Sequence, residues 1–176
     1  MNLTDAPDEV LITDVHGNPV AGVSVTWAVP PGTGSVNPTG SPTDINGRAT
    51  TTRTLGLTPG TQTTTATATL SGGSTTVTFS VTATEGGATQ MTINGGNTQA
   101  DTVGQTLPTP LAVRVADQFN NPVAGVLISW SVVDGGGSVN PATSTTDGSG
   151  IATTSWTLGT AMTPTDTTQF AQATGV

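Results

Sequence analysis

The side chains that could do chemistry in this chain are few and scattered. The only histidine is His16, and cysteine is absent, so thiolate nucleophiles, thiolate metal sites and disulfides are excluded. Of the 11 acidic residues only Glu9 and Glu85 are glutamates, and the acids do not form a pattern that predicts a catalytic carboxylate pair. His16 is expected to be an exposed turn residue, because a catalytic or metal-binding role would need partners. We therefore predict no catalytic, cofactor-binding or metal-ligating residues, no cofactor and no enzymatic activity.

Four aspartates stand where turns are expected. Asp14 and Asp117 each end an alternating segment, and Asp44 and Asp147 each stand in a Thr-Asp-x-x-Gly sequence. Aspartate in such places commonly accepts hydrogen bonds from the backbone of its own turn, which would explain all four. Calcium is the alternative ligand, since it prefers carboxylate and carbonyl oxygens, but these loops lack the dense acidic spacing of a dedicated calcium loop.

Other binding functions find little support. The sequences GTGSVNP and GGGSVNP are rich in glycine, but they contain no lysine and precede no helix, so a phosphate-binding loop is rejected. The formal net charge is −8 with three basic residues, all arginine. Nucleic acid and anionic membrane surfaces are excluded as direct partners, because both require clustered cations. No apolar run reaches membrane-spanning length, and the N-terminal sequence does not have the pattern of a signal peptide.

One stretch of the chain occurs twice and organises everything else. Residues 14–29 read DVHGNPVAGVSVTWAV, and residues 117–132 read DQFNNPVAGVLISWSV. The same offset of 103 residues separates Trp27 from Trp130 and continues as far as Gly56 and Gly159. A period of that size is typical of one self-contained β-sandwich of about 100 residues. We therefore predict two domains, residues 1–86 and 87–176.

The segments that must position these residues have the two-residue period of β-strands. Val23, Val25, Trp27 and Val29 alternate with polar residues, as do their counterparts around Trp130, so both tryptophans are predicted core residues. Threonine is abundant, favours strands over helices, and no segment shows a helical stripe. The fold class is therefore all-β. Three finer expectations follow. Trp156 is the aromatic residue most expected to be exposed, because its counterpart is polar, although packing in the core is favoured even there. Arg53 is expected to reach water at the end of the sandwich, and residues 88–103 are expected to form a split first strand.

The sequence does not contain two whole repeats, and each copy is missing a different part. Subtracting 103 leaves the first copy without a counterpart of residues 88–103, its first strand, and the second copy without a counterpart of residues 73–84, its last strand. In one interpretation the chain is a piece of a longer array, divided away from the domain boundary. In the other, a strand from another chain completes each open edge, and molecules join head to tail into a filament.

The ordered set DxxGNPVAGVxVxWxV, a glycine loop, SVNP, TDxxGxA and a strand ending in Leu-Gly resembles the bacterial Ig-like domain of the intimin/invasin type (group one), in two tandem copies. The resemblance implies two immunoglobulin-like β-sandwiches, the first lacking its first strand and the second lacking its last. It also implies an extracellular or cell-surface location within a larger secreted bacterial protein. The expected function is a non-enzymatic spacer, whose partners are neighbouring Ig-like domains of the same or another chain.

Two alternatives to the spacer stay open. The chain could be an adhesion module that binds a protein or glycan ligand with its loops, and a cluster of exposed aromatic and polar residues would favour that function. It could also be the filament subunit that strand complementation would produce. The spacer function predicts an elongated particle with a short, stiff hinge around residues 85–88.

Overall fold

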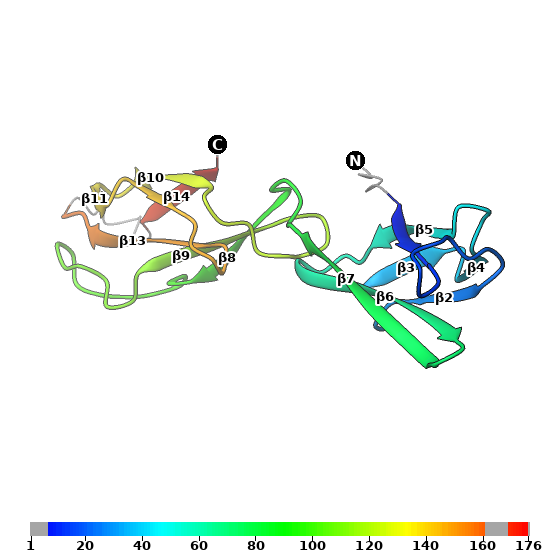
Figure 1. Ribbon diagram of the computed structural model, residues 1–176. Coiled ribbons are helices and arrows are strands. Elements are labelled where there is room, and N and C mark those ends of the chain that lie inside the picture. Colours follow the sequence, from blue (N-terminus) through cyan, green and yellow to red (C-terminus); the bar gives the residue numbers. More distant parts are fainter. Residues whose placement is uncertain (1–6, 161–168, 176) are drawn as a thin grey trace. The chain divides into compact units, whose positions relative to one another are not determined.

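The structure, a computed structural model, describes residues 7–160 and 169–175, and in this part of the chain it consists of strands and loops without a helix. The all-β prediction is confirmed. The chain divides into two compact units, Met1–Thr84 and Glu85–Val176 (Figure 1). The described residues contain no helix that is long and apolar enough to cross a membrane.

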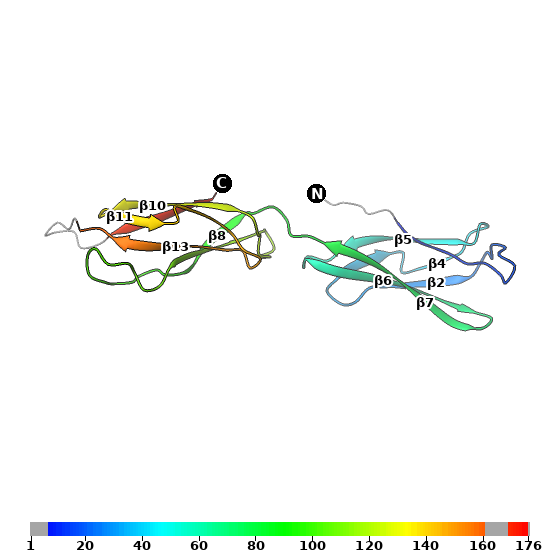
Figure 2. The ribbon, with the colours of Figure 1, turned by 60° about the vertical axis from the view of Figure 1, so that its left-hand side comes forward.

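Each unit is built from two antiparallel sheets, which form separate layers in Figure 2. In the first unit the sheet orders are β1-β5-β3 and β4-β2-β6-β7. The strands of this unit are β1 (Asp8–Leu11), β2 (Ser24–Ala28), β3 (Gly34–Asn37), β4 (Gly40–Pro42), β5 (Arg48–Leu55), β6 (Gly60–Leu70) and β7 (Gly73–Ala83).

In the second unit the sheet orders are β11-β13-β9-β8 and β12-β10-β14. The strands are β8 (Gln90–Gly95), β9 (Leu111–Ala116), β10 (Leu127–Asp134), β11 (Gly137–Asn140), β12 (Thr143–Thr145), β13 (Ile151–Leu158) and β14 (Phe170–Gly175). The predicted split first strand is wrong in its second half. Only residues 90–95 form a strand, because the chain turns away at Gly96, whose φ is +75°.

Apolar and polar residues that alternate in the sequence are alternately buried and exposed in the strands. In β2, Val25 and Trp27 are buried while Ser24, Thr26 and Ala28 are exposed. The two sheets of the first unit enclose a core around Trp27, and those of the second enclose one around Trp130, as predicted. This follows from strand geometry, which sends successive side chains to opposite faces.

The repeat is preserved in the pairing of strands. Val25 of β2 lies opposite Ala68 of β6, and its counterpart Ile128 lies opposite Gly175 of β14. The last strand therefore follows an offset of 107 residues, while the earlier strands follow 103. The difference lies in the connection between β13 and β14, which includes residues 161–168.

The units differ by one strand each. β8 pairs with β9 in the second unit, whereas β1, the counterpart of β9, pairs only with β5 among the strands of residues 7–160 and 169–175. β7 pairs with β6 over its whole length in the first unit, whereas β14 has β10 as its only described neighbour. We refer to the unpaired sides of β1 and β14 as the open edges. That each copy lacks one strand of a complete sandwich stays a prediction.

Arg53 corrects one expectation. It was expected to extend to water, but its side chain is only 6% exposed. Its guanidinium donates to the Thr63 and Thr33 carbonyl oxygens at 2.7 and 3.0 Å, to the Thr64 hydroxyl at 2.5 Å and to Gln62 Oε1 at 3.3 Å. The chain therefore buries this cation by surrounding it with neutral acceptors, which offset part of the cost of removing it from water.

Candidate functional site

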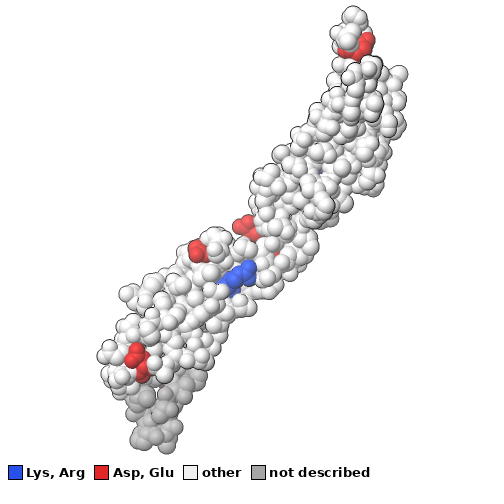
Figure 3. Space-filling view, turned by 90° about the horizontal axis from the view of Figure 1, so that it is seen from below, with Lys and Arg blue, Asp and Glu red and all other residues white. Residues whose placement is uncertain are grey.

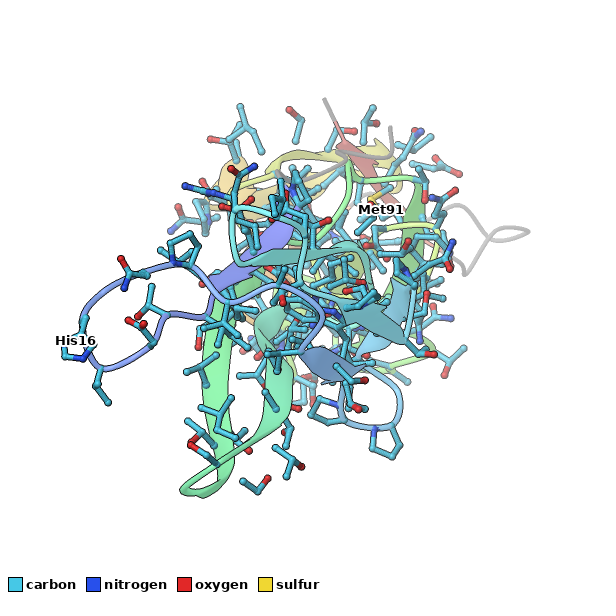
Figure 4. All side chains as sticks on the ribbon, turned by 45° about the vertical axis from the view of Figure 1, so that its right-hand side comes forward. His16 and Met91 are labelled. Carbon is cyan, nitrogen blue, oxygen red and sulfur yellow. The ribbon has the colours of Figure 1, made fainter. Side chains whose placement is uncertain are left out.

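His16 lies in the turn that follows β1 and points away from the fold (Figure 4). Its side chain is exposed, and its backbone N–H donates to Asp14 Oδ1 at 2.9 Å. Within residues 7–160 and 169–175, no group of three His, Cys, Asp or Glu side chains could hold a metal ion. His16 therefore has the surroundings of a turn residue.

Asp14 and Asp117 organise equivalent turns. Asp14 Oδ1 accepts the backbone N–H groups of His16 and Asn18, and its Oδ2 accepts the Asn18 side-chain amide. Asp117 forms the same three bonds with Phe119 and Asn121. Hydrogen bonds donated to a carboxylate stabilise its charged form, so the Asn18 side chain and the backbone lower the pKa of Asp14.

Asp117 has a further partner that Asp14 does not have among residues 7–160 and 169–175. Its Oδ2 accepts the backbone N–H of Gly86 at 3.0 Å, and its carbonyl oxygen accepts from Gln90 Nε2 at 2.9 Å. Asp117 is only 1% exposed. The Asn121 side-chain bond and the backbone bonds lower the pKa of Asp117 to about 2. The carboxylate thus holds the segment before β8 against the rest of the second unit.

Asp44 and Asp147 also serve their own turns. Asp44 Oδ1 accepts from the backbone of Asn46 at 2.8 Å and of Arg48 at 2.9 Å, and Asp147 Oδ1 accepts from Ser149 and Ile151 at 2.8 and 2.9 Å. The Arg48 backbone bond is the largest influence that lowers the pKa of Asp44. The turns therefore account for all four aspartates that the sequence singles out.

The tryptophans belong to the cores. Trp27 and Trp130 are 2% and 6% exposed, and their indole N–H groups donate to Ser41 Oγ at 3.0 Å and Ser144 Oγ at 2.8 Å. Trp156 is buried as well, so packing in the core prevailed there too. It lines a pocket of about 380 Å³ together with Leu107 and Ala171. These rings do not form an exposed platform for a ligand.

Phe119 is an exposed aromatic residue that the sequence did not lead us to predict. It is 49% exposed in the turn that corresponds to that of His16. The repeat could have predicted this exposure. Phe119 aligns with His16 in a hydrophilic turn, where no core is near enough to bury a phenylalanine. Around it we find no cluster of exposed aromatic side chains among the described residues, and Figure 3 shows one face on which the few charged side chains are separated by uncharged surface.

The first unit contains a groove of about 440 Å³ between β1 and β7. Its sides include Leu11, which is 55% exposed, and Val77, which is 46% exposed, and Ala66 and Ala68 of β6 also line it. Phe79 of β7 reaches inward from the groove to Trp27, with ring centroids 6.1 Å apart. We call this feature the β1–β7 groove. It lies along the open edge of β1 and was not identified as a groove from the sequence.

A protein-family model matches part of the first unit. Residues 7–80 match the model of the bacterial Ig-like domain (group 1). Among solved structures, the chain is similar to the D00-D0 domain of intimin, with 17% identity, a TM-score of 0.43 and coverage of 97% of this chain and 91% of that chain. It is also similar to the D0-D1 domain of intimin, with 16% identity, a TM-score of 0.37 and coverage of 95% and 87%. No curated protein sequence matches the chain.

Proposed function

We propose that the chain is a non-enzymatic spacer in an extracellular bacterial surface protein of the adhesin type. The proposal is supported by the match of residues 7–80 to the bacterial Ig-like domain (group 1), and by the second unit, which repeats most of the sequence and strand order of the first. The observation that carries the proposal is the structural use of the polar side chains. The four turn aspartates accept hydrogen bonds from their own turns, and the buried Trp27 and Trp130 bond to serines of their own units.

A hydrogen bond at the start of the second unit favours a stiff spacer. A spacer holds a distance only if its linkers resist bending. Gly86 stands in the short sequence Glu85-Gly86-Gly87, which two glycines would make flexible. Its N–H bond to the buried Asp117 removes part of that freedom. We expect this bond to make the hinge around residues 85–88 stiff.

The experiment is a distance measurement by pulsed electron paramagnetic resonance. The chain has no cysteine, so Thr52→Cys and Ser155→Cys place two spin labels at equivalent exposed sites of β5 and β13 without competing reactions. A stiff spacer gives a narrow distribution of distances. Asp117→Asn, which replaces the Oδ2 acceptor of Gly86 by a donor, should broaden it.

Asp14→Asn is the matched control, because it alters the same turn in the first unit, where the acceptor bonds are local. It should leave the distribution narrow. A broad distribution in the unsubstituted chain would refute the stiff spacer. Small-angle scattering from the same samples should show an elongated particle, and a compact one would count against the proposal.

The β1–β7 groove favours a second function, the binding of a strand from another chain. Adhesion through loop surfaces has less support, because Trp27, Trp130 and Trp156 are all buried. The groove offers both an unpaired strand and apolar side chains, which are the two requirements for recognition by strand addition.

A further inference from the structure

The same surface is covered in one unit and open in the other. In the second unit β8 lies beside β9, and Val113 and Val115 are 6% and 3% exposed. Their counterparts in β1 and just after it, Val10 and Ile12, are only half-buried. The repeat therefore shows what kind of segment covers this surface, namely an extended strand with apolar residues at alternate positions.

The backbone of β1 presents the same bonding pattern as that of β9. The Ile12 N–H donates to the Gly47 carbonyl at 2.8 Å, and its counterpart Val115 donates to Gly150, also at 2.8 Å. Because N–H groups alternate in direction along a strand, the N–H groups of Glu9 and Leu11 point to the opposite side. On that side no strand of the described residues pairs with β1. These groups are therefore available to a strand added there.

In the first unit, β7 forms one side of the β1–β7 groove, whereas no described strand lies in that place beside β8 in the second unit. In the second unit Ile93 is 66% exposed and Met91 is 42% exposed, although they are the apolar residues of β8 (Figure 4 labels Met91). The described residues of that unit contain no strand in the place of β7. In the first unit, Val77 and Phe79 of β7 line the groove opposite β1. A strand of this kind would therefore bury more apolar surface in the first unit than β8 does in the second.

We propose that the β1–β7 groove binds an extended peptide strand antiparallel to β1, in the register in which β8 pairs with β9. The donor is a β8-type strand of another Ig-like repeat. The register places the equivalent of Ile93 opposite Val10 and that of Met91 opposite Ile12. The proposal goes beyond the spacer function and does not depend on it, since a flexible chain could still carry the groove.

The donor strand must come from outside a completed unit. If β8 of one molecule moved to the groove of another, it would uncover Val113 and Val115 in the unit that it leaves. Exchange between folded copies would then create one exposed apolar surface for each one that it covers. We therefore expect a strand that is not already packed, rather than exchange between intact molecules, to fill the groove.

The test uses the full chain, labelled with ¹⁵N, and a synthetic peptide with the sequence of residues 89–96, TQMTINGG. Nuclear magnetic resonance should show shifted signals and slower hydrogen exchange at the Glu9 and Leu11 amides, with shifts at Val77 and Phe79. The signals of β9 should not change. No change up to the solubility limit of the peptide, or changes confined to β9 or β14, would overturn the proposal.

Matched variants separate specific pairing from weak adhesion. The peptide with Met91→Asp and Ile93→Asp should not bind, because two carboxylates would enter an apolar groove. In the protein, Val77→Asp should weaken binding by about tenfold or more, while Thr78→Asp, an exposed neighbour on the other face of β7, should leave the affinity unchanged. Amide spectra show whether each variant is folded. Equal binding to the folded Val77→Asp and Thr78→Asp variants would contradict the proposed register.

Discussion

The backbone N–H of Gly86 donates to Oδ2 of Asp117 at 3.0 Å, across 31 residues of sequence. Asp14 occupies the equivalent position in the first unit and forms the same turn, but its acceptor bonds are made within that turn. One carboxylate of the repeat therefore has two tasks, since it closes a turn and anchors the segment that leads into β8. The difference accounts for the burial of Asp117, whereas Asp14 is exposed.

Asp117→Asn should lower the melting temperature of the second unit more than Asp14→Asn lowers that of the first. Asparagine keeps Oδ1 for the turn but presents an NH₂ group where Oδ2 accepts from Gly86 and Asn121. A buried donor without an acceptor is costly, and an exposed one can bond to water. Calorimetry of both variants checks the difference, and equal losses would show that the Gly86 bond contributes nothing measurable.

The stability of the second unit should depend on pH at the acid end. The pKa of Asp117 is about 2 in the fold, against an ordinary value of 3.8. Between these values the unfolded chain binds the proton more readily, so the stabilisation is complete above about pH 4 and is lost as the pH falls towards 2. The lowered pKa values of Asp14 and Asp44 act in the same direction in the first unit.

Urea denaturation at several pH values measures this effect. The difference in stability between the unsubstituted chain and Asp117→Asn should shrink as the pH is lowered from about 4 to about 2, because protonation removes the same acceptor. A difference that stays constant across this range would show that the carboxylate of Asp117 does not titrate with a lowered pKa.

Arg53 and Thr64 should behave as a pair. Arg53 donates to the Thr64 hydroxyl, and the corresponding positions of the second unit hold Trp156 and Ala171, at offsets of 103 and 107. Arg53→Trp alone should destabilise the first unit, because the ring meets the Thr64 side chain and leaves its hydroxyl unpaired. Adding Thr64→Ala should restore part of the loss, since it provides the space that Ala171 provides for Trp156.

Hydrogen exchange at the amides of β5 and β6 reports this coupling within the first unit. The loss in the double variant should be smaller than the sum of the two single losses. Thr52→Ala, at an exposed position of β5, is the control and should combine additively with Arg53→Trp. Additive losses for Arg53→Trp and Thr64→Ala would mean that the two positions do not compensate each other.

Trp27→Ala should cost about 3–5 kcal/mol in the stability of the first unit, because the ring fills the core and its loss leaves a cavity. Ser41→Ala should cost about 1–3 kcal/mol, since it leaves the buried indole N–H without its acceptor. Urea denaturation followed by the amide signals of this unit measures both. Thr54→Ala, exposed on β5, should have little effect, and an equal loss there would undermine the hydrogen-bond explanation.

The amino-acid sequence by itself determined the all-β class, the repeat and the cores around Trp27 and Trp130. These features depend on local patterns, because the two-residue period decides which face of a strand a side chain occupies. The turn aspartates are equally local, since each accepts hydrogen bonds from backbone groups two and four residues further on.

Only the tertiary structure decided which side chains are buried, which form hydrogen bonds and which strand edges are unpaired, where the neighbouring residues come from another strand. Arg53 is buried because the acceptors that surround it come from β6 and from the loop before β3. Asp117 differs from Asp14 because its Oδ2 also accepts a hydrogen bond from the backbone N–H of Gly86, which lies far away in the sequence. The β1–β7 groove arises because two strands far apart in the sequence form its walls. The alternation of residues along one strand determines which face of the sheet a side chain occupies. It does not determine which residues lie opposite that side chain, and those residues set the free energy of burying it.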